Sequence, residues 1–290
     1  MGETVDATGA GGGWVEQVTA PDGISLHAEG GGDGPPVVMV HGLGYASWAA
    51  EPIRPILSRE HTFVTYDNRG SGRSDKPDGP YSIRLLAEDA VAVIERLCGQ
   101  SHLIGYSMGG YIALTVALRR PDLVSSLVLI ATSGGGGHAT DVPEQTRRAW
   151  DAASGLPPGP FARETMPLSF RPGWTDERPQ DFEDILRRRL AFPTPPAAWR
   201  AQYGACADYL GSGVHVERVS APTLIIHGTA DRVVPLPNAF ALVGAIPDAR
   251  LCVLTGAGHL TWFEQPDRVA DLISEFYRSL RRTTTAVTRP

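Results

Sequence analysis

The 290-residue chain has few cysteines, no long apolar run and no excess of basic side chains. Cys98, Cys206 and Cys252 are an odd number and stand far apart, which argues against a disulfide framework or a cysteine metal site. No apolar run approaches the length of a membrane span. The formal net charge of −6 argues against nucleic acid as a partner. These absences favour an ordinary globular protein that binds neither nucleic acid nor membrane.

The first residues also lack a secretory signal, since residues 1–13 are rich in glycine and have no basic start or apolar core. We expect this segment to be a disordered arm and the threonine-rich residues 281–290 to be a loose tail. Unpaired cysteines fit a reducing compartment, so a cytoplasmic location is expected.

Between these ends, short apolar runs alternate with helical patterns. Residues 15–19 and 24–28 flank a Pro-Asp-Gly turn and predict a hairpin. Six further runs are continuously apolar, which is typical of strands buried on both faces of a parallel sheet. These runs are residues 37–40, 63–66, 102–106, 127–130, 223–227 and 251–254. Together with helical patterns at 83–97, 110–118 and 266–280, they predict an α/β fold with a doubly wound, mostly parallel eight-stranded sheet.

The alternation breaks between residues 133 and 215. This segment opens with four glycines at 134–137 and is rich in proline, arginine and aromatic residues. Its helical patterns are residues 143–152, 180–190 and 197–210, without a strand pattern. We therefore expect a helical cap over residues 133–215, inserted into a core formed by residues 14–132 and 216–280.

The most informative motif is Gly-x-Ser-x-Gly at residues 105–109, between a strand pattern and a helical pattern. This arrangement predicts a sharp turn from strand to helix that exposes the serine hydroxyl. A side chain at either glycine would collide with neighbouring backbone. Ser107 is therefore the candidate nucleophile, and it requires a base because a serine hydroxyl is weakly nucleophilic on its own.

Four motifs follow one another in a fixed order, each after a strand pattern. They are His-Gly-Leu-Gly at residues 41–44, the serine motif at 105–109, Asp231, and Gly258-His259. In this order and at these strand ends they resemble the motifs of the α/β-hydrolase fold, over roughly residues 14–280. The resemblance implies a catalytic triad in the chain order Ser, Asp, His, with no cofactor and no metal.

His259 and Asp231 complete that triad. An imidazole can accept the serine proton and return it to a leaving group, and the small residues before His259 suit such a loop. Asp231 would hold the tautomer of His259 and stabilise its charged form. The alternative for Asp231 is a turn aspartate or a partner of Arg232.

The resemblance also implies an oxyanion hole formed by the backbone amides of Leu43 and Met108. Gly42 and Gly44 would let the loop after residues 37–40 approach the nucleophile closely. His41 is expected to form structural hydrogen bonds in this turn rather than to act as a second base.

An apolar substrate pocket is expected above Ser107. Gly42, Tyr45, Trp48 and Trp262 are predicted to line it, together with Met108 and part of a set of cap aromatics. That set is Trp150, Phe161, Phe170, Trp174, Trp199 and Tyr203.

Three consecutive arginines in the cap, residues 187–189, could bind an anionic substrate. Glu183 and Asp184 stand four residues before Arg187 and Arg188, which is the spacing of salt bridges along a solvated helix face. That face is favoured for most of the cluster, and one inward arginine stays open.

We therefore predict a serine hydrolase that cleaves an ester or lactone of a small-to-medium, largely apolar carboxylic acid. The chain most resembles the enol-lactonase and small-esterase branch. The alternative is a carbon–carbon bond hydrolase acting on vinylogous diketones. Those enzymes share the run Ser107 to Gly110 but typically have tryptophan after the catalytic histidine, where this chain has Leu260. A ligand-binding or biosynthetic member of the fold is a further alternative, and a homodimer stays open as the oligomeric state.

Overall fold

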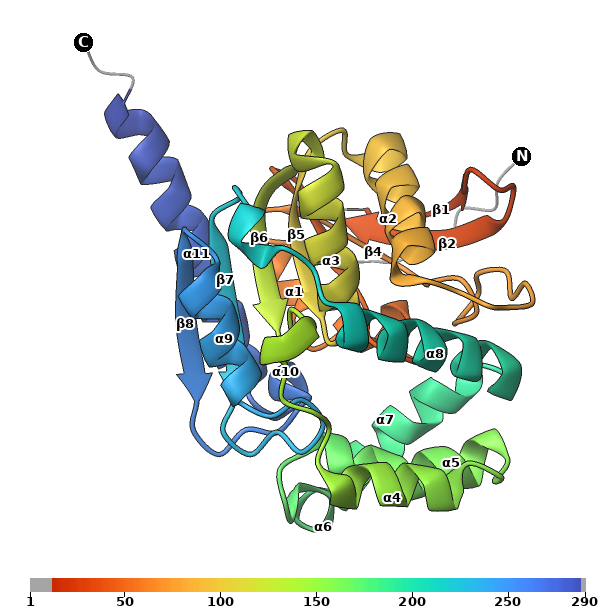
Figure 1. The fold of residues 1–290 in the computed structure, drawn as a ribbon. Helices are drawn as coiled ribbons and strands as arrows, with labels where there is room; N and C mark the ends of the chain where they lie inside the picture. Colours follow the sequence, from red (N-terminus) through yellow and green to blue (C-terminus); the bar gives the residue numbers. More distant parts are fainter. Residues whose placement is uncertain (1–11, 288–290) are drawn as a thin grey trace.

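A single mixed sheet runs through the centre of the computed structural model, which describes residues 12–287 (Figure 1). Within that range the sheet has eight strands in the order β1-β2-β4-β3-β5-β6-β7-β8. The strands are β1 (Trp14–Thr19), β2 (Ser25–Gly31), β3 (Pro36–Val40), β4 (Thr62–Tyr66), β5 (Ser101–Tyr106), β6 (Val124–Ile130), β7 (Thr223–Gly228) and β8 (Ala249–Leu254). β2 pairs antiparallel with β1 and β4, and the other pairs are parallel.

The predicted doubly wound sheet is confirmed, and its winding determines where a site can form. β3 lies between β4 and β5, so the chain reverses its winding direction at β3. In open α/β sheets, ligands bind outside the carboxyl ends of the strands at such a switch point. Val40 at the end of β3 is in register with Gly105 of β5. The loops that follow these two strands are therefore neighbours.

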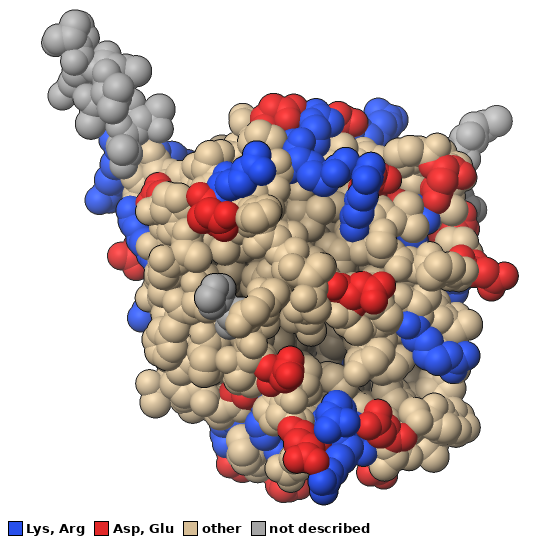
Figure 2. Space-filling view, in the orientation of Figure 1, with Lys and Arg blue, Asp and Glu red and all other residues tan. Residues whose placement is uncertain are grey.

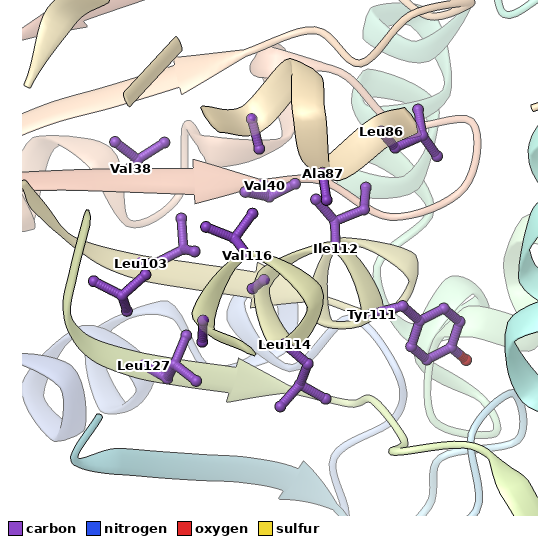
Figure 3. Close-up of a cluster of buried hydrophobic side chains, with 14 of the residues drawn as sticks. Val38, Val40, Leu86, Ala87, Leu103, Tyr111, Ile112, Leu114, Val116 and Leu127 are labelled. Carbon is purple, nitrogen blue, oxygen red and sulfur yellow. The ribbon is translucent and has the colours of Figure 1, made fainter. Parts of the chain in front are cut away.

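Helices cover both faces of the sheet. One face carries α2 (Ile83–Leu97), α3 (Met108–Arg119) and α9 (Pro237–Ala245). The other carries α1 (Arg54–Leu57), α10 (Thr261–Glu264) and α11 (Pro266–Val287). Figure 3 shows side chains of α2 and α3 packed on those of β3, β5 and β6. Burial of the strands on both faces explains why they read as continuous apolar runs.

The segment between β6 and β7 is helical, as predicted. It contains α4 (Glu144–Ala153), α5 (Pro158–Thr165), α6 (Trp174–Glu177), α7 (Pro179–Ala191) and α8 (Pro196–Ser212). In Figure 1, α8 crosses beside α2 and α3, whereas α4 to α7 lie farther from the sheet. α5 was not predicted, because it begins with Pro-Gly-Pro, a run that resembles a turn but also suits the first turn of a helix.

The C-terminal segment differs from its prediction. α11 continues to Val287, so residues 281–287 are helical and not a loose tail, while residues 288–290 lie outside the described residues. No glycine or proline interrupts the chain between Pro266 and Pro290, and helix propagation is favourable once a helix has formed. Residues 1–11 of the predicted arm also lie outside the described residues, and β1 begins at Trp14. None of the described helices is long and apolar enough to cross a membrane.

Candidate active site

Ser107 stands on a strained turn between β5 and α3. Its backbone has φ of 53° and ψ of −119°, a conformation that non-glycine residues rarely adopt. The Ser107 amide donates to the carbonyl of Ile130 on β6. A Cβ on Gly105 would lie 2.5 Å from the carbonyl oxygen of Gly109, and one on Gly109 would lie 2.1 Å from that of Val40. Both glycines are therefore required by close backbone contact, as the sequence predicted.

The side chains of Ser107, His259 and Asp231 form one hydrogen-bonded chain. Nε2 of His259 lies 3.1 Å from Oγ of Ser107, and Nδ1 of His259 lies 2.8 Å from Oδ2 of Asp231. Ser107 follows β5, Asp231 follows β7, and His259 follows β8. The carboxyl ends of these parallel strands lie at one edge of the sheet, which brings together residues separated by more than a hundred positions. Such a chain can move the serine proton onto the imidazole.

Asp231 is held as a carboxylate. Its side chain is fully buried, and burial alone would raise its pKa, but the charge of His259 and hydrogen bonds from His227 and His259 lower the pKa to about 2. The amides of Val233 and Val234 both donate to Oδ1. Asp231 is thus not paired with Arg232, whose guanidinium donates to the carbonyls of the cap instead.

The sequence did not single out His227, which also contacts Asp231. It is fully buried at the end of β7, and its Nε2 lies 3.3 Å from Oδ2 of Asp231. The same nitrogen donates to the carbonyl of Val234. The only sequence signal was its position at the end of a strand pattern, four residues before Asp231.

The predicted oxyanion loop lies beside the nucleophile. Leu43, Ser107 and Met108 line the same cavity, and a Cβ on Gly42 would lie 3.2 Å from Cβ of Ser107. The Tyr45 amide donates to the carbonyl of Gly42, and Gly44 has φ of 70°. Positive φ at the third position is typical of a type II turn, which explains the glycine there. Leu43 and Met108, whose amides are predicted to form the oxyanion hole, therefore both line the cavity that contains Ser107.

His41 and Asp67 stabilise the loops around Ser107 through hydrogen bonds. Nε2 of His41 lies 2.5 Å from Oγ1 of Thr65, and burial lowers the pKa of His41 to about 4, against the opposite effect of Asp67. Asp67 accepts hydrogen bonds from the amides of Ser47 and Arg73. Both residues are structural, and neither lines the cavity above Ser107.

A cavity of about 750 Å³ lies over Ser107, between the core and the cap. Most of its walls are apolar or aromatic, which suits a small organic molecule. Figure 2 shows a hollow in the region of the cap helices, with acidic and basic side chains interspersed around it. The lining residues are Leu43, Tyr45, Tyr106, Ser107, Met108, Tyr111, Val142, Trp150, Phe161, Thr165, Met166, Ser169, Arg189, Trp199, Tyr203, Cys206, Leu210, Val233, Val234 and His259.

Several predicted pocket residues lie elsewhere. Tyr45 lines the cavity, whereas Gly42 lies beneath it against Tyr106 and Ser107. Trp262 is fully buried in the core, where its Nε1 donates to the carbonyl of Ala49. Trp48 lines a different depression, and its ring centroid lies 5.6 Å from that of Tyr45. Of the four predicted pocket residues, Gly42, Trp48 and Trp262 therefore do not line this cavity, because proximity to a catalytic loop in the sequence does not specify the direction in which a residue packs.

The six aromatic residues predicted for the cap also divide between the cavity and the buried core. Trp150, Phe161, Trp199 and Tyr203 line the cavity above Ser107. Phe170 and Trp174 are buried and stack on each other, with ring centroids 4.1 Å apart. Cys206 also lines the cavity; burial raises its pKa to about 12, so it remains a neutral thiol.

Arg189 is the inward arginine that the sequence left open. Arg187 pairs with Asp184, and Arg188 pairs with Glu51, both on the exposed surface. Arg189 instead lines the cavity and lies over the ring of Tyr45, 4.8 Å from its centroid. Among the described residues, no carboxylate lies within salt-bridge distance of its guanidinium. Among the described residues that line the cavity, Arg189 is therefore a cation without an acidic partner.

Comparison with known proteins agrees with this architecture. The model of the alpha/beta hydrolase family matches residues 37–272. 2-Hydroxymuconate semialdehyde hydrolase of Pseudomonas sp. (strain CF600) is 29% identical, over 88% of this chain and 90% of that protein. A thermophilic esterase from Thermogutta terrifontis superimposes with a TM-score of 0.79 at 28% identity, covering 92% of this chain and 99% of the esterase. The enol-lactonase of Burkholderia xenovorans LB400 shares the fold, with a TM-score of 0.78 at 22% identity, covering 91% of this chain and 100% of the lactonase.

The fold and the site thus define a class of proteins with a doubly wound sheet, a nucleophile elbow and an inserted cap. The chain belongs to the alpha/beta hydrolase family. Its relatives and structural neighbours include hydrolases of several kinds, so the comparisons alone leave the scissile bond undetermined.

Proposed function

We propose that the protein is a serine hydrolase that cleaves a carboxylic ester or lactone through an acyl-enzyme. Ser107 would be the nucleophile, His259 the general base and acid, and Asp231 the residue that orients the imidazole. The observation that carries the proposal is the hydrogen-bonded chain from Ser107 through His259 to Asp231, at the floor of a largely apolar cavity.

The reaction would run in two halves. Oγ of Ser107 attacks the carbonyl carbon as its proton moves to Nε2 of His259, and the amides of Leu43 and Met108 hold the resulting oxyanion. His259 then protonates the leaving alkoxide, which leaves the acyl group on Ser107. Water attacks that ester with His259 as base, and the acid is released. The buried carboxylate of Asp231 stabilises the imidazolium in both halves.

The experiment is a comparison of the natural chain with Ser107→Ala on a panel of p-nitrophenyl esters and lactones. We expect turnover by the natural chain, its abolition in the variant, and labelling of Ser107 by a fluorophosphonate probe. Turnover that survives Ser107→Ala, or the absence of labelling in a folded protein, would refute the assignment. Circular dichroism shows whether each protein is folded.

A second candidate is hydrolysis of a carbon–carbon bond in a vinylogous diketone. Arg189 favours it, because the guanidinium can hold a substrate carboxylate beside the nucleophile, and a 2-hydroxymuconate semialdehyde hydrolase is among the relatives. Leu260 follows His259 and is fully buried, and in this respect the chain departs from that branch. Assaying carboxylated vinylogous diketones beside esters separates the two candidates by their kcat/KM values.

A further inference from the structure

Gln202 connects the cap to the loop beneath the cavity. It lies on α8 and is fully buried. Its Oε1 accepts a hydrogen bond of 3.0 Å from the Gly44 amide, and its Nε2 donates to the carbonyl of Arg69 and to Oγ of Ser71, each at 2.9 Å. The amide end of Gln202 is therefore fully engaged, and every partner belongs to the core.

The orientation of this side-chain amide is determined by its partners. A backbone N–H can only donate and a backbone carbonyl can only accept, so Oε1 must face Gly44 and Nε2 must face Arg69. Arg69 is itself anchored, since its guanidinium donates to both carboxylate oxygens of Asp89. Gln202 thus holds the loop at Gly44 against a rigid point of the core.

Gly44 is the third residue of the turn that carries Leu43. The hydrogen bond of the turn joins the Tyr45 amide to the carbonyl of Gly42, so it leaves the Gly44 amide without a partner inside the turn. Gln202 supplies that partner, and it thereby specifies which way the peptide between Leu43 and Gly44 faces. A buried amide left without an acceptor would instead favour a different peptide orientation.

We propose that Gln202 is a positioning residue for the oxyanion hole, which couples the hole to the docking of the cap. This inference rests on the proposed serine hydrolysis. Other cap side chains touch the same loop: a Cβ on Gly44 would lie 3.2 Å from Trp199 and 3.2 Å from the guanidinium of Arg189. When α8 is docked, this hydrogen bond holds the Leu43–Gly44 peptide, which adjoins the Gly42–Leu43 peptide that carries the Leu43 amide. When α8 moves away, Gly44 would lose its acceptor and the turn its constraint.

The test is Gln202→Met, which keeps the length of the side chain and removes its hydrogen bonds. With p-nitrophenyl butyrate we expect kcat to fall about tenfold to a hundredfold with KM changed less than threefold, because removal of an oxyanion donor itself costs about 10²- to 10³-fold. A trifluoromethyl ketone adds to Ser107 and forms an oxyanion, so its Ki should rise by the same factor as kcat/KM falls.

Two variants control for structural damage. Ser71→Ala removes one hydrogen bond of Gln202 and leaves the Gly44 contact, so kcat and Ki should stay within threefold of the natural chain even if the melting temperature falls. Gln202→Leu removes the same hydrogen bonds with a different side-chain shape, so it should lose kcat as Gln202→Met does, and it tests the idea if Gln202→Met does not fold.

The inference fails if Gln202→Met is as active as Ser71→Ala, or if its Ki for the ketone is unchanged while kcat falls. A folded Gln202→Leu variant whose kcat stays within threefold of that of the natural chain would also refute it. These outcomes are distinct from failure of the proposed function, in which the natural chain has no ester turnover that depends on Ser107.

Discussion

Arg189 should give the cavity a preference for anionic substrates. We predict that the natural chain favours a p-nitrophenyl monoester of a dicarboxylic acid over the p-nitrophenyl ester of the matching monocarboxylic acid. The reason is that the guanidinium faces the cavity with no acidic partner among the described residues, whereas its neighbour Arg188 is paired with Glu51. Substitution of Arg189 by glutamine should remove the preference.

The size of the effect follows from the environment of the guanidinium. A hydrogen bond to a charged group contributes about 1.5–3 kcal/mol, which corresponds to about 10- to 100-fold in kcat/KM. Arg189 is only half-buried and already contacts the ring of Tyr45, so we expect the lower half of that range. Salt screens a partly exposed charge, and the preference should shrink as ionic strength rises.

The assay compares kcat/KM for the two esters in the natural chain, Arg189→Gln and Arg188→Gln. Each variant removes one positive charge from α7. The long-range electrostatic attraction between the protein and an anionic substrate is therefore weakened equally in both variants. The acid ester should lose about tenfold in Arg189→Gln only, while the neutral ester changes less than threefold. An equal loss for both esters, or an equal effect of Arg188→Gln, would show that Arg189 does not bind the carboxylate.

Three further variants test the scaffold and the triad. Gly109→Ala should destabilise the fold by several kcal/mol in urea unfolding because its Cβ would overlap a carbonyl of β3, whereas Gly244→Ala, with open space around it, should be neutral or stabilising. Asp231→Asn should lower kcat roughly 10⁴-fold with KM little changed, and a smaller effect would contradict its role. Burial lowers the pKa of His102 from 6.5 to about 4, so the unfolded chain binds a proton that the folded chain excludes, and stability is lost as pH falls through that range. His102→Gln should flatten this loss, and an unchanged pH profile would contradict the assignment.

The sequence patterns were sufficient to predict the sheet and the strand ends at which the candidate catalytic residues stand. Four of the six apolar runs that predict buried strands lead into a motif, and parallel strands place their carboxyl ends at one edge. Ser107, Asp231 and His259 could therefore be named without coordinates, because a strand end specifies where the next residues lie. Gly105 and Gly109 were equally predictable, because the requirement for glycine at these positions depends only on how closely the neighbouring backbone approaches.

Which side chains line the cavity depends on how the folded chain packs. Consecutive helical residues point about 100° apart, so only the packing of α7 on the core decides that Arg189 points into the cavity while Arg187 and Arg188 point outward. The same holds for the indoles, of which Trp199 lines the cavity and Trp262 packs beneath it. Gln202 lies 158 positions from Gly44, and no local pattern marks a buried hydrogen bond between such distant segments.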